Sequence, residues 1–301
     1  MDIARTPYDA LPSSVLAELE AAGVPPRPVY DAIVAALEED LPGGATDVTS
    51  DATIPADAHG AADFAAREPG TVAGLGVAEL VFHYVMGRDV AVSGRVPDGT
   101  RVARGDVLMQ VSGPVRGLLT AERTALNFAC HLSGVATATA AWVDALSGTR
   151  ARVLDTRKSL PTYRTLQKYA VRCGGGVNHR FSLADMALVK DNHVLAAGGV
   201  LPAYRAVRER YPGLPVEVEV TDLDQLRELL DAGCARILLD NMSDEVMAEA
   251  VRVTDGRASL EASGGLTFDR AREVAETGVD FISVGALTHS VKVFDIGLDL
   301  K

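Results

Sequence analysis

Positively charged side chains gather in one stretch of this acidic chain, between Thr156 and Lys190. The stretch contains a single acidic residue, Asp185, and seven Lys or Arg residues: Arg157, Lys158, Arg164, Lys168, Arg172, Arg180 and Lys190. Seven positive charges less one negative charge leave a local excess of +6, in a protein whose formal net charge is −12. Such an excess indicates a pocket or surface that holds a small molecule with several negative charges.

The first two cations, Arg157 and Lys158, follow Thr156 at the end of a predicted strand over 151–156. Arg contacts a carboxylate or phosphate through two parallel N–H donors, whereas Lys supplies a compact point charge. A solvated loop is the alternative for an isolated Arg-Lys pair. The neighbouring cations favour an anion site at this position.

A glycine-rich loop with the sequence CGGGVNHR runs over 173–180 and ends in His179 and Arg180. Three consecutive glycines let the backbone approach a ligand or another segment closely. Arg180 would be a second clamp for an anion. His179 could hydrogen-bond an acid or a ring nitrogen, although a lone histidine more often has a structural role. The alternative for the whole loop is an ordinary helix end with a flexible connector.

Three further charged residues come at the ends of predicted strands: Lys190, Glu219 and Asp240. A lysine directly after an apolar strand needs an anionic partner, because a buried unpaired ammonium group is costly. Carboxylates at the ends of neighbouring strands can hold Mg²⁺ or face a developing positive charge. Salt bridges from Glu219 and Asp240 to Lys158 and Lys190 are the alternative, and both arrangements can hold at once.

Small residues end the last two predicted strands, as Ser263, Gly264 and Gly265 and then as Val284, Gly285 and Ala286. Small residues there expose backbone N–H groups, and a helix predicted to begin near Thr267 adds the positive end of its dipole. The pair of motifs predicts a phosphate site, with His289 as a further donor. Tight strand–helix turns are the alternative for either motif alone.

The elements that position these residues follow a regular rhythm in the second half of the chain. Strands are predicted over 151–156, 185–191, 215–220, 235–240, 258–263 and 280–286, and helices separate them. This alternation predicts parallel βαβ units. Nearly every strand ends in a polar or small residue, and a (β/α) barrel has its active site at those ends. No Gly-x-Gly-x-x-Gly motif follows the first strand, which argues against a dinucleotide site.

The first half of the chain predicts an α+β region. Two helices are expected over 12–40, and short strands, including one over 115–120, alternate with turns over 50–120. One helix, over 77–87, interrupts those strands. A longer helix is expected over 120–146, with Arg123 near its start and Gly134 as a candidate break.

Composition narrows the class of protein. The 301 residues, 48% of them hydrophobic, suffice for one large domain or two smaller ones. The acidic balance argues against a nucleic-acid partner and against an anionic membrane surface. The chain contains no apolar run of about 18 residues, so no membrane span is predicted. The first residues lack the pattern of a signal peptide. Three cysteines without C-x-x-C spacing, Cys130, Cys173 and Cys234, predict reduced thiols in a cytoplasmic protein.

Together these motifs resemble the quinolinate phosphoribosyltransferase family. The resemblance covers nearly the whole chain and rests on AERTALN, DTRK, KYAVRCGGGVNHR, LVKDNH, EVEV, LLDN, EASGGL and SVGALTHS. It implies an α/β fold, with an incomplete (β/α) barrel over 133–301 and a hammerhead-like α+β domain over 1–132. It also implies a pentosyltransferase of de novo NAD biosynthesis. Such an enzyme converts quinolinate and phosphoribosyl pyrophosphate to nicotinate mononucleotide, pyrophosphate and CO₂.

The resemblance assigns roles to the residues named above. Quinolinate would be held by Arg123, Arg157, His179 and Arg180, with Thr156 beside them. Lys158 and Lys190 would bridge the two substrates, and Glu219 and Asp240 would bind the ribose hydroxyls and the cofactor Mg²⁺; these four would be the catalytic residues. Phosphate would be cradled by Ser263, Gly264, Gly265, Val284, Gly285, Ala286 and His289.

The resemblance further implies a cytoplasmic homodimer with shared active sites, with higher oligomers left open. The N-terminal domain of one subunit would cover the barrel of the other, so that Arg123 acts across the interface. One departure from the family pattern is visible. The family's loop after Thr-Arg-Lys commonly has Thr, Pro and Gly before an Arg, whereas residues 159–164 read SLPTYR and lack the glycine.

Two rival functions are weighed against this one. A nicotinate phosphoribosyltransferase of the same fold handles one carboxylate and needs fewer cations, so Arg123, Arg157 and Arg180 together favour the dicarboxylate. A non-catalytic, oxyanion-handling relative, such as those associated with molybdenum transport, could lose its acidic or arginine site residues, and all are present here. The remaining cations, Arg164, Lys168 and Arg172, are spaced as one helix face that is either solvated or in contact with a partner subunit.

Overall fold

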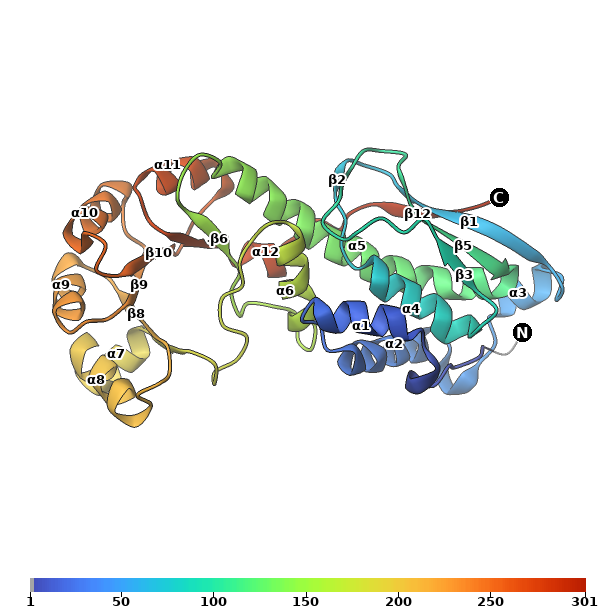
Figure 1. The fold of residues 1–301 in the computed structure, drawn as a ribbon, viewed down its shortest axis with the longest axis horizontal. Coiled ribbons are helices and arrows are strands. Elements are labelled where there is room, and N and C mark those ends of the chain that lie inside the picture. The colour runs from blue at the N-terminus through green and yellow to red at the C-terminus, as the bar shows by residue number, and fades with distance from the viewer. Residues whose placement is uncertain (1–2) are drawn as a thin grey trace. The chain divides into compact units, whose positions relative to one another are not determined.

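A computed structural model describes residues 3–301, drawn in Figure 1. The chain forms two compact units. Unit 1 holds the chain up to Ala138 together with Thr165–Gly174 and Val291–Lys301, and unit 2 holds Thr139–Arg164 and Gly175–Ser290. The units are defined by proximity in space and the chain passes between them more than once, so the single boundary after residue 132 stays a prediction about domains.

Unit 1 is built on an antiparallel sheet. Within the described residues its four strands run in the order β12–β1–β5–β3, with β1 at His59–Ala66, β3 at Ala91–Ser93, β5 at Val107–Pro114 and β12 at Ile296–Leu300. A separate antiparallel pair joins β2 (Gly70–Thr71) to β4 (Arg101–Val102). The helices that precede α5 are α1 (Ser13–Ala21), α2 (Pro26–Asp40), α3 (Val48–Thr53) and α4 (Leu75–Met86). Phe64 and Phe82, both fully buried, meet edge to face in the core.

Helix α5 begins earlier than the sequence predicts. It runs unbroken over Val115–Ala145, so the strand expected over 115–120 is wrong and Gly134 breaks nothing. A short, mostly apolar segment such as 115–119 does not distinguish strand from helix. Here Arg116 fixes the first turn by donating to the Ile54 carbonyl oxygen at 2.8 Å. Gly134 instead permits a close approach, because a Cβ there would clash with the Lys292 carbonyl oxygen.

Unit 2 is an α/β structure around a parallel sheet, as the strand–helix alternation predicts. Within the described residues six strands run in the order β6–β11–β10–β9–β8–β7. The strands are β6 (Arg152–Leu154), β7 (Ala187–Val189), β8 (Val216–Val220), β9 (Arg236–Asp240), β10 (Ser259–Ser263) and β11 (Phe281–Ser283). In this part of the chain the edge strands β6 and β7 do not pair with each other, so the barrel is incomplete. All six strand predictions are confirmed.

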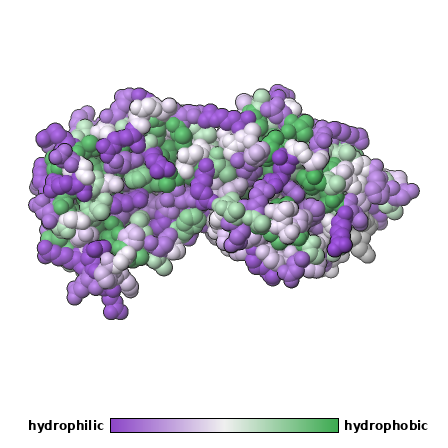
Figure 2. Space-filling view, in the orientation of Figure 1, coloured by the Kyte–Doolittle hydropathy of each residue, from purple (hydrophilic) through white to green (hydrophobic). Residues whose placement is uncertain are grey.

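Helices pack on the outer face of this curved sheet (Figure 1). They are α7 (Asp191–Ala197), α8 (Val200–Arg210), α9 (Leu223–Asp231), α10 (Asp244–Thr254) and α11 (Ala271–Glu276). The short helix α12 (Ala286–His289) instead follows the carboxyl end of β11. In α9 the buried side chains are Leu226, Leu229 and Leu230, which form one apolar stripe. The outer surfaces of α9 and α10 are largely hydrophilic in Figure 2. None of the helices in the described part of the chain has the length and apolar character needed to cross a membrane.

Helix α6 (Arg164–Cys173) departs from the βα pattern. It follows β6 in sequence, yet nearly all of it belongs to unit 1. There the Tyr169 hydroxyl donates to the Asp98 carboxylate at 2.8 Å, and Lys168 is completely buried. The solvated alternative is therefore wrong for Lys168, which is buried in unit 1, and Arg172 donates to the Ala22 carbonyl oxygen of the same unit. Arg164 belongs to unit 2, where it donates to the Phe181 carbonyl oxygen at 3.1 Å.

Candidate functional site

A cavity of about 260 Å³ opens in unit 2. Its lining brings together seven of the residues predicted from sequence: Thr156, Arg157, Lys158, His179, Arg180, Lys190 and Ser263. The rest of the lining is Leu188, Leu238, Glu261 and Ser283. Four Lys or Arg side chains thus share one cavity with one carboxyl group, which gives the cavity a positive balance suited to an anion.

Backbone pairing along β6 brings the two cation-bearing loops together. Val177 adds to the free edge of β6, where its N–H donates to the Val153 carbonyl oxygen at 2.8 Å. Asp155, fully buried at the end of β6, accepts from the His179 backbone N–H at 2.9 Å and from the Asn178 side chain at 2.5 Å. The glycine-rich loop therefore ends beside Arg157.

Two arginines in the cavity have surroundings that suit an anionic ligand. The Nε atom of Arg157 is buried and has no hydrogen-bond partner among the described residues. Burial, and after it the positive charge of nearby Arg157, holds the pKa of Arg180 below its usual range. A buried donor without a partner is costly, as is a pair of like charges. An anionic ligand between the two guanidinium groups would remove both costs.

Residues that follow β11 in the chain hold Lys158 in position. The Thr288 hydroxyl donates to the Lys158 carbonyl oxygen at 2.6 Å, and the Lys158 N–H donates to the Thr156 hydroxyl at 3.0 Å. Gly285 leaves space for the Lys158 side chain, because a Cβ there would lie 3.0 Å from Lys158 Cδ and 3.1 Å from His289 Nε2. The small residue predicted at this strand end thus makes room for a cation and a histidine.

Lys190 and Glu219 form an ion pair, with 2.9 Å between Nζ and Oε2. Glu219 is buried and Lys190 is half-exposed, so the salt-bridge alternative holds for this pair. Asp240 accepts from the Asn241 side chain at 2.8 Å. Because Glu219 pairs in register with Leu238, Asp240 lies two residues nearer the carboxyl end of the sheet, on the same side of it.

Steric restriction explains why glycine follows β10. Gly264 has φ +91°, and a Cβ there would clash with the Asn241 side chain. Ser263 pairs in register with Asp240 on β9 and lines the cavity. A 3₁₀ turn at Phe268–Arg270 precedes α11, and α12 begins directly after Gly285.

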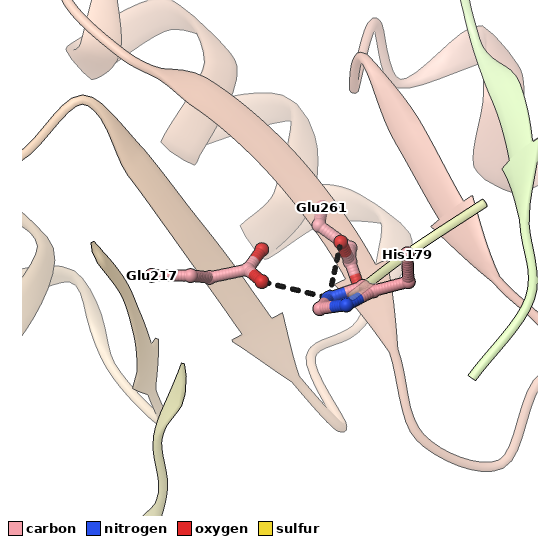
Figure 3. A group of neighbouring side chains, drawn as sticks. All are labelled: His179, Glu217 and Glu261. Atoms are coloured by element: carbon pink, nitrogen blue, oxygen red, sulfur yellow. Dashed lines mark hydrogen bonds and ion pairs between the residues drawn. The ribbon is translucent and has the colours of Figure 1, made fainter. Parts of the chain in front are cut away.

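A charged cluster at the cavity, drawn in part in Figure 3, contains three residues that sequence reasoning missed, Glu217, Glu261 and Arg236. Its members are His179, Glu217, Glu261 and Arg236. Successive residues of a strand point to opposite faces, so Glu217 lies on the same face as Glu219 and Glu261 on the same face as Ser263. If the alternation of side chains is followed backwards from Glu219 and Ser263, it predicts that Glu217 and Glu261 share their faces of the sheet.

Hydrogen bonds join all four members of this cluster. His179 Nε2 lies 2.8 Å from a Glu217 oxygen and 3.5 Å from a Glu261 oxygen. Arg236 donates to Glu217 at 2.8 Å and to Glu261 at 2.6 Å. Burial, followed by the negative charge of Glu217, raises the pKa of Glu261 to about 7. Burial also disfavours the charged form of Glu217, but His179 and Arg236 outweigh it and hold the pKa of Glu217 below its usual range.

Arg123 is the one predicted substrate-binding residue that belongs to unit 1. It is exposed in the interior of α5 rather than at the start of the helix. It lines a separate cavity of about 440 Å³ together with Asn127, Cys130 and His131. Arg123, Asn127 and His131 are spaced four residues apart, so they share one stripe of the helix.

Comparison with known families decides the assignment. The sequence matches the N-terminal domain of quinolinate phosphoribosyl transferase over residues 47–133 and the C-terminal domain over residues 135–299. The chain belongs to the quinolinate phosphoribosyltransferase family. The resemblance seen in its motifs is thereby confirmed, as is the fold class.

Individual members of the quinolinate phosphoribosyltransferase family agree. The chain is 54% identical over 274 residues to the carboxylating nicotinate-nucleotide pyrophosphorylase of Mycobacterium leprae, covering 90% of this chain and 96% of that one. It is 40% identical over 312 residues to the chloroplastic enzyme of that name from Oryza sativa subsp. japonica, covering 96% and 83%. The solved nicotinate-nucleotide pyrophosphorylase of Francisella tularensis superposes with a TM-score of 0.88 at 38% identity, covering 92% and 98%.

The loop that departs from the quinolinate phosphoribosyltransferase pattern contains a strained residue. Thr162 has φ +65°, in the left-handed region that favours glycine. It lies between the cations at 157–158 and α6. A β-branched residue in this conformation costs on the order of 1–2 kcal/mol. The glycine that the family commonly has before the arginine of this loop would avoid that cost.

We therefore expect Thr162→Gly to raise the free energy of unfolding by about 1 kcal/mol, once the extra entropy of glycine in the unfolded chain is subtracted. Urea unfolding measures this change. Thr162→Ala retains a Cβ and should stay within about 0.5 kcal/mol of the unaltered protein. A glycine variant that is less stable than the alanine variant would contradict the strain.

Proposed function

We propose that this chain binds quinolinate and phosphoribosyl pyrophosphate at the unit 2 cavity and joins them to give nicotinate mononucleotide, pyrophosphate and CO₂. The chain has the carboxylating nicotinate-nucleotide pyrophosphorylase activity of de novo NAD synthesis. The observation that carries the assignment of the cavity is the buried, unpartnered Nε of Arg157 among four cations. A pyridine dicarboxylate would satisfy this donor and neutralise the charge around it.

In this proposal Arg157 and Arg180 bind the two carboxylates of quinolinate, with Thr156 beside them. Lys158 and Lys190 lie between the two substrates, where each can meet a carboxylate or a phosphate oxygen. His179 already has protein partners at both ring nitrogens, Arg180 N–H at Nδ1 and Glu217 at Nε2. We assign it the role of holding the substrate-binding loop in place.

Glu219 and Asp240 are proposed to hold Mg²⁺ and the ribose hydroxyls. Their carboxylate oxygens are the ligand type that Mg²⁺ prefers, and the two residues end neighbouring strands on the same side of the sheet. When bound, Mg²⁺ would neutralise the charge of the leaving pyrophosphate. The phosphate groups would be held by Ser263, Gly264, Gly265, Val284, Gly285, Ala286 and His289.

The proposed reaction depends on positioning and electrostatics rather than on a protein base. As the bond from the anomeric carbon to pyrophosphate breaks, positive charge develops on the ribose ring, where Glu219 and Asp240 stabilise it. The pyridine nitrogen, aimed by the two arginines, attacks the anomeric carbon. The ring nitrogen is then positively charged and stabilises the electron pair that stays on the adjacent ring carbon when its carboxylate leaves as CO₂. A proton from water then bonds to that carbon in place of the carboxylate.

Arg123 requires a second subunit in this proposal. We infer a cytoplasmic homodimer in which Arg123 of one chain completes the quinolinate site of the other. Its exposure on α5 supports this inference, because an exposed arginine is free to reach another chain. The pocket beside it, lined by Asn127 and His131, would then face the partner.

An assay with two pyridine substrates tests the proposal. The protein is incubated with phosphoribosyl pyrophosphate, Mg²⁺ and either quinolinate or nicotinate, and CO₂ and mononucleotide are measured. We expect quinolinate to be turned over with kcat/KM at least about 100-fold above nicotinate, because nicotinate leaves one arginine unpaired. Failure to release CO₂ from quinolinate, or equal use of nicotinate, would contradict the proposed substrate. A reaction without phosphoribosyl pyrophosphate is the blank.

A further inference from the structure

The inner end of the cavity is closed by charged side chains rather than by the apolar layers usual inside a barrel. Glu217 and Glu261 are almost completely buried, on β8 and β10. Arg236, on β9 between them, donates to both and lies 4.9 Å from the centre of the Phe281 ring. Buried ion pairs are weak contributors to stability. Stability alone therefore does not explain this cluster, and we look for its role in the function of the cavity.

The tautomer of His179 follows from its neighbours. The backbone N–H of Arg180 lies 2.7 Å from His179 Nδ1, and a backbone amide can only donate. Nδ1 is therefore the acceptor and carries no proton. The single ring proton is on Nε2, directed at Glu217 at 2.8 Å.

The charges of the cluster then depend on Glu261 alone. Glu217 and Arg236 cancel, so an ionised Glu261 leaves one net negative charge buried at a cavity that must accept a dianion. A protonated Glu261 leaves no net charge there. Burial and the nearby Glu217 charge favour this protonated form, with a pKa of about 7 for Glu261. Chemically, His179, Glu217 and Glu261 could also surround a metal ion, but Arg236 already supplies the positive charge to both carboxylates.

We propose that quinolinate binds to this site together with one proton, which Glu261 holds. This inference rests on the proposed function, because it takes quinolinate as the ligand of the cavity. Glu261 lines the cavity itself, so its charge acts directly on the bound dianion. The charged or titratable groups around it are Glu217 on β8, Arg236 on β9 and His179, and across the cavity Arg157, Lys158, Arg180 and Lys190.

The sign of the pH effect follows from linkage. If only the protonated form binds, the Kd for quinolinate is constant below about pH 7 and rises about tenfold per pH unit above it, or about 30-fold by pH 8.5. Glu261→Gln keeps the shape of the side chain and cannot ionise. We expect its Kd to change less than about 3-fold between pH 6 and 8.5, so that at pH 8.5 it binds quinolinate about 30-fold more tightly than the unaltered protein.

Isothermal titration of the full-length protein with quinolinate measures both Kd and proton uptake. Titrations at pH 8 in buffers of different ionisation enthalpy should give close to one proton taken up by the unaltered protein and close to none by Glu261→Gln. Glu261→Asp retains a titrating carboxyl group and should restore the pH dependence. Glu228→Gln, at an exposed position on α9, is the matched control and should titrate like the unaltered protein.

The possible outcomes distinguish failure of the Glu261 inference from failure of the proposed function. Binding of quinolinate with no proton uptake, or with the same pH dependence in Glu261→Gln, would overturn the role of Glu261 and leave the proposed function standing. Absence of quinolinate binding by the unaltered protein would overturn both. Thermal unfolding of each variant shows whether it is folded, and Glu261→Asp keeps the test decisive if Glu261→Gln is not.

Discussion

Replacing Arg157 with Ala should lower kcat/KM for quinolinate by about 10³-fold and leave the fold intact. Truncation of one partner in a buried, charge-assisted hydrogen bond costs about 2–5 kcal/mol, and about 4 kcal/mol corresponds to a 10³-fold change in rate. The stability should not fall, because the Nε of Arg157 has no hydrogen-bond partner to lose among residues 3–301. The change also removes a positive charge close to Arg180.

Steady-state kinetics with quinolinate as the varied substrate measures the loss, and thermal unfolding measures stability. Arg157→Lys should recover only part of the activity, because an ammonium group cannot replace a planar pair of donors. Arg152→Ala is the matched control, because Arg152 is exposed on β6, the strand that leads to Arg157, and lies outside the cavity lining. Equal losses in the Arg157 and Arg152 variants would contradict a specific anion contact.

Two inactive variants should restore activity to each other if active sites are shared. In a mixed dimer of Arg123→Ala and Lys158→Ala, one site combines an intact barrel with an intact Arg123, and the other site carries both defects. Random pairing makes about half of the dimers mixed, so about one quarter of all sites are intact. We expect activity to rise from below about 1% for either variant to about 25% for the mixture.

The variants are co-expressed, so that dimers assemble from mixed chains, and activity is measured at fixed total protein. A mixture of Arg157→Ala and Lys158→Ala is the control. Both changes lie in the same cavity of unit 2, so every site in that mixture has at least one defect. Recovery in the control as well, or recovery in neither mixture, would contradict an Arg123 that acts across subunits.

The strand ends of unit 2 were predictable because the carboxyl ends of parallel strands meet at one edge. Thr156, Arg157, Lys158, Lys190 and Ser263 could therefore be placed together from sequence alone. The interior of the barrel was harder. Glu217 and Glu261 lie inside short strands where acidic residues are rare, and residue type alone does not distinguish a buried carboxylate from an exposed one. Only the alternation of side chains along each strand indicates that both face the cavity.

Tertiary placement explains the other misses. Lys168 has the spacing of a solvated helix face, but its helix packs within unit 1 and the side chain is completely buried. The start of α5 was predicted as a strand, since the four apolar or small residues around Arg116 at 115–119 fit either element. Both errors arise where contacts with distant parts of the chain, not local pattern, decide the structure.

The pairing of β12 with β1 also constrains the order in which the molecule can fold during synthesis. Ala62 pairs with Leu300, and Arg67 bonds Asp299 across a separation of 232 residues. A ribosome adding about 5–20 residues per second needs roughly 10–50 s to cover that distance. During this time one edge of β1 has no strand beside it, and exposed edges invite pairing with other chains. A fragment cut after residue 132 would keep that edge open permanently, so the first unit is completed only once Ile296–Leu300 have been synthesised.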